Sequence, residues 1–294
     1  MSKAVRPLLR QAASELREVG VSSAEQEARQ LLAYAAGVEL ARLPLLDAVE
    51  DAQAAYFEVL IKKRARRIPL QHLTGRAHFR YLEVEVGPGV FVPRPETEVM
   101  TGWAIEQLRP MVYAVARGES RHLPLVVELG TGSGAVAKSI ALELTGTRVH
   151  AVELSEEAAA YAARNLADTT VELHVQDMIG ALPELSGTVD LVIANPPYIP
   201  LEAFESVLPE VRDYDPPLAL FSGDDGLDAI KVAAAEAARL LRPAGLLCVE
   251  HADLQGESAQ QVLVRHGAFA GVRDHLDLNG RPRFVTAVRM SRYP

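Results

Sequence analysis

The sequence has one cysteine, Cys248, and few aromatic residues, which make up 5% of its 294 residues. A lone cysteine excludes a disulfide within the chain, and this is typical of a protein from a reducing compartment. Cys248 stands in the apolar run GLLCVE, where a buried position is expected.

Long apolar runs are also missing. No stretch approaches the roughly 18 consecutive apolar residues that a membrane-spanning helix needs. Charged residues interrupt the first segment, MSKAVRPLLRQAASEL, too early for a secretory signal peptide. We therefore expect a cytoplasmic protein that does not associate with a membrane.

A surplus of basic residues is lacking too, because the formal net charge is −9 at pH 7. Such a chain has no general attraction for nucleic acid, so we expect no specific DNA binding. The local basic run KKRARR, residues 62–67, has two interpretations. It contacts ribosome-associated RNA or an acidic protein surface, or it is the solvated face of a helix, which is the more common case.

The length favours more than one domain. Residues 1–72 carry apolar residues at helical spacing and predict a small helical bundle without strands. Residues 73–94 alternate apolar and polar residues and predict a β-hairpin linker that turns at residues 87–89. Residues 95–294 then form the main domain, which begins with a helix at Pro95.

Strand and helix patterns alternate from residue 124 onward. The segments that read as strands are LPLVVELG, RVHAVELS, VELHVQDM, TVDLVIAN and AGLLCVEH. This alternation predicts an α/β fold with a mostly parallel sheet and helices on both faces. Ligands of such sheets bind at the carboxyl ends of the strands.

A glycine-rich loop, ELGTGSGA at residues 128–135, joins the first of these strands to its helix. Its glycines allow a sharp turn close to a ligand, and the next helix offers free N–H groups. Glu153 ends the following strand, where a carboxylate can accept hydrogen bonds from ribose hydroxyls. The candidate nucleotide-binding residues are therefore Gly130, Thr131, Gly132, Ser133, Gly134 and Glu153.

The kind of nucleotide stays open at this point. Gly130, Gly132 and Ala135 also satisfy the dinucleotide pattern, so the loop alone does not separate a nicotinamide cofactor from S-adenosylmethionine. Asp177 and Met178 follow the third strand, where the acid can face an adenine amine and the thioether the ring. Alternatively, Asp177 only caps a turn.

The fourth strand runs into IANPPYIP, residues 193–200. Pro196 and Pro197 have no N–H, so this segment presents carbonyl oxygens, and Asn195 adds a side-chain oxygen. Acceptors of this kind suit a substrate NH2 group, because they can hold both hydrogens and aim the nitrogen lone pair at a sulfonium methyl group. Tyr198 can pack against the planar group. The alternative is an ordinary proline-rich turn.

Together these residues resemble a known family. The GTGSG loop, Glu153, Asp177 and Asn-Pro-Pro-Tyr are similar to class I (Rossmann-like) S-adenosylmethionine-dependent methyltransferases that act on planar NH2 groups. From about residue 65, the chain resembles the HemK/PrmC release factor glutamine methyltransferases in the order and spacing of RRIPLQHLTGRAHF, FVPRPETE, VRDYDPPLALFSGDDGLD and DLNGRPRFV.

The resemblance implies methylation of the side-chain amide of the glutamine in the Gly-Gly-Gln motif of bacterial class 1 peptide chain release factors. It implies that residues 130–134, Glu153 and Asn195 contact S-adenosylmethionine and that Met178 lies beside the adenine. It also implies that the glutamine is held by Asn195, Pro196, Pro197 and Tyr198. One departure is Glu250-His251-Ala252, where members often have an acid followed by Ile-Gly.

Several alternatives remain. Arg94 and Glu96 line the methionine end of the cofactor or the substrate entrance, or this stretch only starts a helix. The substrate is a release factor, or a ribosomal protein methylated on glutamine, or adenine in DNA, which the acidic balance disfavours. A non-enzymatic binding module is a further rival. We expect no metal, because no cysteine or histidine stands at metal-ligand spacing from His72, His78 or His251.

Overall fold

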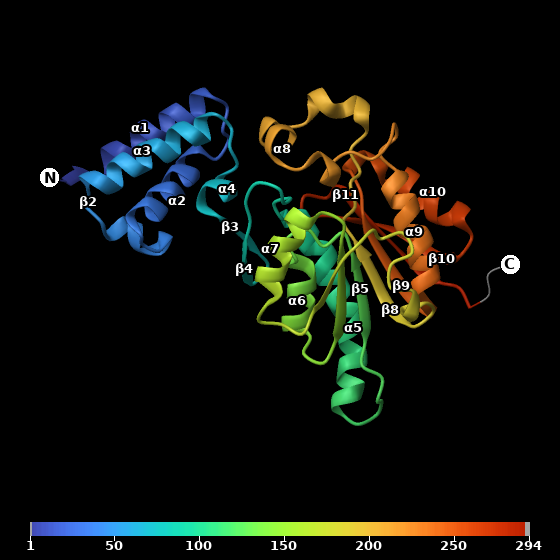
Figure 1. Cartoon of the computed structure of the whole chain (residues 1–294). Coiled ribbons are helices and arrows are strands. Elements are labelled where there is room, and N and C mark those ends of the chain that lie inside the picture. The colour runs from blue at the N-terminus through green and yellow to red at the C-terminus, as the bar shows by residue number, and fades with distance from the viewer. Residues whose placement is uncertain (1, 292–294) are drawn as a thin grey trace. The chain divides into compact units, whose positions relative to one another are not determined.

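The computed structural model describes residues 2–291 (Figure 1). They form two compact units. The first unit contains the residues up to Arg76 together with Leu208–Tyr214, and the second contains Ala77–Val207 and the residues from Asp215 onward. Within the described part of the chain, no helix is long and apolar enough to cross a membrane.

The first unit is mainly helical. Its helices pack their apolar faces around a core that includes Leu16, Leu31 and Phe57, and they are α1 (Val5–Glu18), α2 (Ala24–Ala36), η1 (Leu40–Leu45), α3 (Asp51–Ala65) and α4 (Leu70–Thr74). The expectation of no strands was wrong, because β1 (Ser2–Ala4) pairs antiparallel with β2 (Ala48–Glu50). Strands of three residues are too short to show a period in the sequence.

Part of the basic run lies inside this unit instead of on its solvated face. Arg64 is 4% exposed, and its guanidinium contacts Glu27 at 2.5 Å and Glu210 at 2.9 Å. Arg67 contacts the second oxygen of Glu210 at 2.6 Å. Glu210 belongs to α8 (Pro209–Tyr214), 146 residues after Arg64, so sequence spacing gave no sign of the pairing. Lys62, Lys63 and Arg66 are exposed as expected.

The second unit contains a seven-stranded sheet with the order β10-β11-β9-β8-β5-β6-β7 (Figure 1). The pairs from β9 through β7 are parallel, and β11 pairs antiparallel with both β9 and β10. The predicted α/β class with a mostly parallel sheet is therefore confirmed. The strands are β5 (Leu125–Leu129), β6 (Arg148–Glu153), β7 (Glu172–Val175), β8 (Val189–Ala194), β9 (Leu241–Glu250), β10 (Phe269–Leu276) and β11 (Pro282–Arg289).

Helices cover both faces of this sheet, so the side chains of its central strands are buried on both sides. Val126 packs into one apolar cluster and Val127 into the other. The first cluster involves α5 (Pro95–Ala116), α6 (Ala135–Glu143) and α7 (Glu156–Leu166), and the second involves α9 (Asp228–Leu240) and α10 (Gly256–His266). Short helices η2 (Pro183–Leu185), η3 (Leu201–Ser206), η4 (Pro217–Ala219) and η5 (Asp253–Gln255) lie in the connections.

A hairpin of β3 (Arg76–Phe79) and β4 (Leu82–Glu85) lies near the predicted position, but its turn does not. The strands are joined at residues 80–81, and residues 87–89 follow the second strand. Arg80 adopts a φ of 52° without being a glycine. Its guanidinium binds both carboxylate oxygens of Glu143 at 2.7 Å. The turn therefore has no glycine signature.

Candidate active site

The carboxyl ends of four neighbouring strands meet at one edge of the sheet. Leu129 of β5 is level with Val152 of β6 and Ala194 of β8, and Ala194 is level with Val249 of β9. The next residue of each strand or loop is therefore brought to the same rim. These residues are Gly130, Glu153, Asn195 and Glu250.

The glycine loop and Glu153 are joined directly. The Glu153 carboxylate accepts hydrogen bonds from the backbone N–H of Gly132 at 2.7 Å and of Ser155 at 2.8 Å. Gly130 and Gly132 have φ values of 73° and 56°, which favour glycine, and a Cβ added at either would meet no atom within 4 Å. The loop therefore borders open space beside a carboxylate.

A second glutamate, Glu128, also binds the glycine loop, and it does so from the buried interior of the sheet. Glu128 is 3% exposed, and it accepts hydrogen bonds from Thr131 Oγ1 at 2.6 Å and from the Ala137 N–H at 2.9 Å. Burial raises the pKa of Glu128 to about 8. No sequence motif identifies Glu128, and the available signal is an acid within the otherwise apolar strand LVVEL. Thr131 and Ser133 are also buried, and Gly134 precedes α6.

Asp177 and Met178 follow β7. Asp177 is exposed, and its Oδ1 accepts a hydrogen bond from the Ile179 N–H at 2.9 Å. This is the turn-capping role that was the alternative interpretation. Met178 is half-buried and packs against the apolar cluster on one side of the sheet. Their contact with an adenine remains a prediction.

Asn195 follows β8 and is half-buried. Its Nδ2 donates a hydrogen bond to Thr97 Oγ1 at 3.2 Å. The amide oxygen therefore lies on the other side of the amide group from Thr97. Pro196 is buried, and Pro197 is half-buried.

Tyr198 is held at both ends. Its hydroxyl donates to Glu250 Oε1 at 3.1 Å, and its backbone carbonyl accepts from Gln255 Nε2 at 2.9 Å. The chain also packs tightly at this carbonyl, because a Cβ at Gly226 would come within 2.2 Å of the Tyr198 oxygen. The ring position is therefore set by the protein, while packing of the ring against a substrate remains a prediction.

Glu250 is the buried acid at the centre of this network. It is 1% exposed, and its Oε2 accepts a hydrogen bond from Thr97 Oγ1 at 2.7 Å. Burial raises the pKa of Glu250 to about 7, although Thr97, Arg283 and Tyr198 act in the opposite direction. Neither Thr97 nor Glu250 was assigned a role from the sequence. The sequence feature that could have indicated Glu250 is an acid at the carboxyl end of a predicted central strand.

The PRPETE stretch starts a helix, as expected from Pro95. Arg94 pairs with the buried Asp215 at 2.6 Å and lies 5.0 Å from the centroid of the Phe91 ring. Burial raises the pKa of Asp215 to about 6. Glu96 is half-buried, and its charge contributes to the raised pKa of Glu250. Roles of Arg94 and Glu96 toward cofactor or substrate remain predictions.

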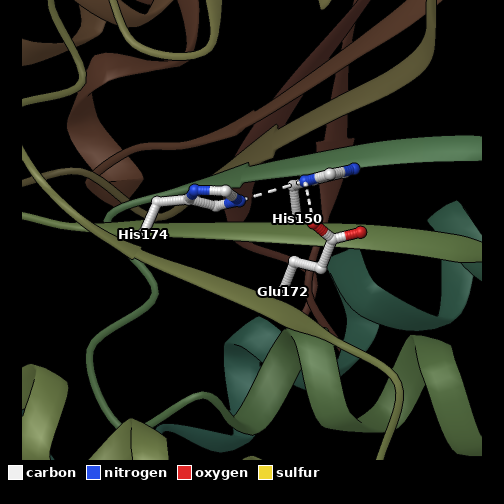
Figure 2. Close-up of side chains that lie close together, drawn as sticks. All are labelled: His150, Glu172 and His174. Carbon is white, nitrogen blue, oxygen red and sulfur yellow. Dashed lines mark hydrogen bonds and ion pairs between the residues drawn. The ribbon is translucent and has the colours of Figure 1, made fainter.

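A group with metal-ligand chemistry lies elsewhere on the sheet, on β6 and β7. Figure 2 shows His150, Glu172 and His174, whose possible ligand atoms lie within 4.8 Å of one another. Two imidazoles and a carboxylate are a common zinc ligand set. However, His150 Nδ1 and His174 Nε2 already share a hydrogen bond of 3.0 Å, and their rings stack. The two histidines therefore already bond to each other. That the reaction uses no metal remains a prediction.

Comparisons with known domain families match both units. A model of the PrmC N-terminal domain matches residues 7–75, and a methyltransferase domain model matches residues 126–214. A solved methyltransferase from Pyrococcus furiosus has a TM-score of 0.51 at 19% identity, over 78% of this chain and 98% of that chain. The solved structure supports the fold.

Sequence relatives are similar over almost the whole chain. A release factor glutamine methyltransferase from Streptomyces coelicolor is 50% identical over 94% of this chain and 95% of its own length. One from Mycolicibacterium smegmatis is 43% identical over 98% and 99%. A 4-amino-L-phenylalanine/4-methylamino-L-phenylalanine methyltransferase from Streptomyces pristinaespiralis is 44% identical over 66% of this chain and 65% of its own length. At this identity and coverage, the chain belongs to the family of release factor glutamine methyltransferases.

Proposed function

We propose that this protein transfers a methyl group from S-adenosylmethionine to the side-chain amide nitrogen of the glutamine in the Gly-Gly-Gln motif of bacterial class 1 release factors. The relatives named above support the substrate. The observation that carries the chemistry is the bond from Asn195 Nδ2 to Thr97, which leaves Asn195 Oδ1 as an acceptor at the rim. Because release factors act in translation termination, the protein would carry out this reaction in the cytoplasm.

The residues of the rim suit this cofactor. Open space borders Gly130 and Gly132, where a ligand can approach the backbone closely. Each Glu153 oxygen accepts one backbone N–H, and each has a further lone pair for a ribose hydroxyl. When bound, S-adenosylmethionine supplies an activated methyl group on its sulfonium sulfur. Asp177 and Met178 are the proposed residues beside its adenine.

Orientation of the substrate amide is the proposed task of residues 195–198. Asn195 Oδ1 accepts one of the two NH2 hydrogens. The Tyr198 carbonyl is already bound by Gln255, so the second acceptor is expected from the carbonyl of Pro196 or Pro197. With both hydrogens held, the amide plane is fixed, and the nitrogen lone pair, perpendicular to that plane, is aligned with the methyl group. Such positioning can lower a barrier by about 7–11 kcal/mol in the best cases.

A strong base is not required in this scheme. The new N–C bond would form as the S–C bond breaks, with the sulfur leaving as a neutral thioether, and the methylated amide would then carry a positive charge. This species is acidic, so its extra proton would pass to water after the transfer. Asn195 is neutral and acts through its hydrogen bond, while Tyr198 lies beside the planar amide.

One relative supports the class of acceptor independently. The name of the Streptomyces pristinaespiralis protein gives 4-amino-L-phenylalanine and 4-methylamino-L-phenylalanine as its substrates. The first of these carries an NH2 group on a planar ring. This similarity supports a site built for planar NH2 groups, while the near full-length relatives support glutamine as the member of that class.

The N-terminal helical region, residues 1–72, is proposed to recognise the release factor away from the reacting glutamine. The hairpin at 73–94 would link it to the methyltransferase domain, residues 95–294, with Arg94 and Glu96 at the substrate entrance. The match of residues 7–75 to the PrmC N-terminal domain model supports a region specific to this family.

A side-by-side labelling experiment tests the substrate. The protein is incubated with S-adenosylmethionine carrying a labelled methyl group and, separately, a purified class 1 release factor, ribosomal protein substrates of glutamine methylation, and adenine-containing DNA. We expect label in the release factor, on the Gly-Gly-Gln glutamine. Label in the ribosomal protein or DNA and none in the release factor would contradict the proposal.

A further inference from the structure

We propose that Thr97 and Glu250 fix which way the Asn195 side-chain amide points, and that they are positioning residues for methyl transfer. The inference rests on the proposed function and deepens it. Neither residue is required to touch the substrate. Both would act through Asn195.

The three side chains come from distant parts of the sequence. Thr97 lies in the first turn of α5 and is 3% exposed, Asn195 follows β8, and Glu250 ends β9. Thr97 is 98 residues from Asn195 and 153 residues from Glu250. The fold nevertheless joins them in one chain of hydrogen bonds, with lengths of 3.2 Å and 2.7 Å.

The hydrogens of this chain can be assigned by counting donors. In its ionised form the Glu250 carboxylate only accepts, so in that form the single hydrogen of the Thr97 hydroxyl is directed to Glu250 Oε2. The Thr97 oxygen then has only lone pairs left for Asn195. Asn195 must therefore turn its NH2 group toward Thr97, and its oxygen points away.

Tyr198 completes the arrangement. Its hydroxyl donates to the other oxygen of Glu250 at 3.1 Å, so each carboxylate oxygen has one donor. Glu250 consequently orients two residues of the Asn-Pro-Pro-Tyr segment, Asn195 through Thr97 and Tyr198 directly. Burial makes the arrangement firm, because an unpaired polar group in such a place costs free energy.

The alternative orientation of Asn195 would not work. An amide rotated by half a turn presents NH2 donors to a substrate NH2 that is also a donor. The two groups would repel, and the nitrogen would lose its direction. Without the hydroxyl of Thr97, nothing in this chain of hydrogen bonds distinguishes the two amide orientations.

Substitutions at Thr97 test the inference, with Thr101 as the matched control. Thr101 lies one turn further along α5, is fully buried, and donates its hydroxyl to the Thr97 carbonyl at 2.8 Å. Thr97→Val and Thr101→Val therefore make the same chemical change in the same helix. Thr97→Ser keeps the hydroxyl and serves as the rescue variant.

Three quantities are measured for each variant with whole release factor. They are the single-turnover methylation rate, the KM for release factor and the Kd for S-adenosylmethionine by calorimetry. We expect Thr97→Val to lower the rate about 10- to 100-fold, as loss of a buried hydrogen bond does. Its KM and Kd should change little. Thr97→Ser and Thr101→Val should stay within about threefold of the wild-type rate.

Changes at Glu250 give a second, independent test from the other end of the chain. Glu250→Gln, like a protonated carboxyl, carries a donor beside its acceptor and no longer requires the Thr97 hydrogen, so we expect a lower rate than the wild type at neutral pH. Glu250→Met removes the acceptor at similar volume and should be slow. In an Asn195→Ala background, Thr97→Val should cause no further loss, because Thr97 acts through Asn195.

Several outcomes would overturn the inference. A Thr97→Val enzyme as fast as the wild type would do so, and so would a Thr97→Ser enzyme as slow as Thr97→Val. A further loss from Thr97→Val in the Asn195→Ala background would indicate a role that bypasses Asn195. A wild-type enzyme that fails to methylate release factor would instead contradict the proposed function, and the two failures are therefore distinct.

Discussion

The carboxylate of Glu153 accepts a hydrogen bond from the backbone N–H of Gly132 at 2.7 Å. The acid that ends β6 is thereby fastened to the loop that follows β5, and the two features act as one binding surface. Glu153 is itself mostly buried, so its orientation is set before any ligand arrives. A preorganised acceptor of this kind reduces the cost of binding a ribose.

Replacement of Glu153 by glutamine should weaken cofactor binding. The glutamine NH2 group would face a backbone N–H or a ribose hydroxyl where an acceptor is needed, at a cost of about 1–3 kcal/mol. This cost corresponds to a rise of about 5- to 150-fold in the Kd for S-adenosylmethionine, measured by calorimetry. Glu156→Gln, at an exposed position in the first turn of α7, is the control. Equal affinity of Glu153→Gln and wild type would remove Glu153 from the binding site.

Methyl transfer should lose rate in mild acid because of Glu250. Burial raises the pKa of Glu250 to about 7, and the groups that influence it are Thr97, Tyr198, Arg283 and Glu96. Below that pH the carboxyl carries its own proton and no longer requires the hydrogen of Thr97. We therefore expect the single-turnover rate at saturating cofactor to fall as the pH drops through about 7.

The Glu250→Gln variant supplies the control for this pH profile, because its side chain does not titrate. Its rate should be nearly flat over the same range. The buried Glu128, whose pKa is raised to about 8, lies under the cofactor loop, and saturating cofactor limits its influence. An acid limb that persists unchanged in Glu250→Gln would assign the limb to another group.

Stability should respond to pH in the opposite sense. A carboxyl whose pKa rises on folding favours the folded state most below its ordinary pKa of 4.5, and this contribution is lost as the pH rises through about 7. Compared with the wild type, Glu250→Gln should therefore gain stability as the pH increases across that window. Thermal melting curves at several pH values measure the difference, and a constant difference would contradict the raised pKa.

The ion-pair cluster around Arg64 predicts a large cost for its removal. Arg64 is buried between Glu27 and Glu210, and its truncation leaves the half-buried Glu27 without it, while Glu210 keeps Arg67. Arg64→Ala should lower the free energy of unfolding of the first unit by about 2–3 kcal/mol, at or below the low end of the range for breaking a fully buried pair. Lys63→Ala, at an exposed position of the same helix, should have little effect. Urea unfolding followed by circular dichroism checks this, and similar stability of the two variants would contradict a structural role for the cluster.

Whole release factor should be a far better substrate than a short Gly-Gly-Gln peptide. The acceptor site holds only the amide, so the remaining affinity is expected from recognition by the N-terminal region. We expect kcat/KM for the peptide to be lower by at least about 100-fold, which equals about 2.7 kcal/mol of lost binding. Steady-state kinetics on both substrates measure the ratio. Comparable values would assign recognition to the rim alone.

Local patterns predicted the rim well, whereas long-range contacts were not predictable. The glycine loop, Glu153 and Asn-Pro-Pro-Tyr are each written in a few consecutive residues, and the parallel strand order brings them together. Thr97 and Glu250 form a hydrogen bond although they are 153 residues apart in the sequence, and no spacing pattern predicts a contact at that separation. The Arg64–Glu210 pair was missed for the same reason. The hairpin turn was misplaced because Arg80, and not a glycine, takes the positive φ there.

The central claim is that Asn195 aims the substrate amide without binding the cofactor tightly itself. Its most direct test is Asn195→Ala, studied by single-turnover methylation of release factor at saturating S-adenosylmethionine, with the cofactor Kd measured in parallel. The account predicts a fall in rate of at least about 100-fold with only a small change in Kd, as for loss of an oriented hydrogen bond in a transition state. A rate equal to that of the wild type would contradict it.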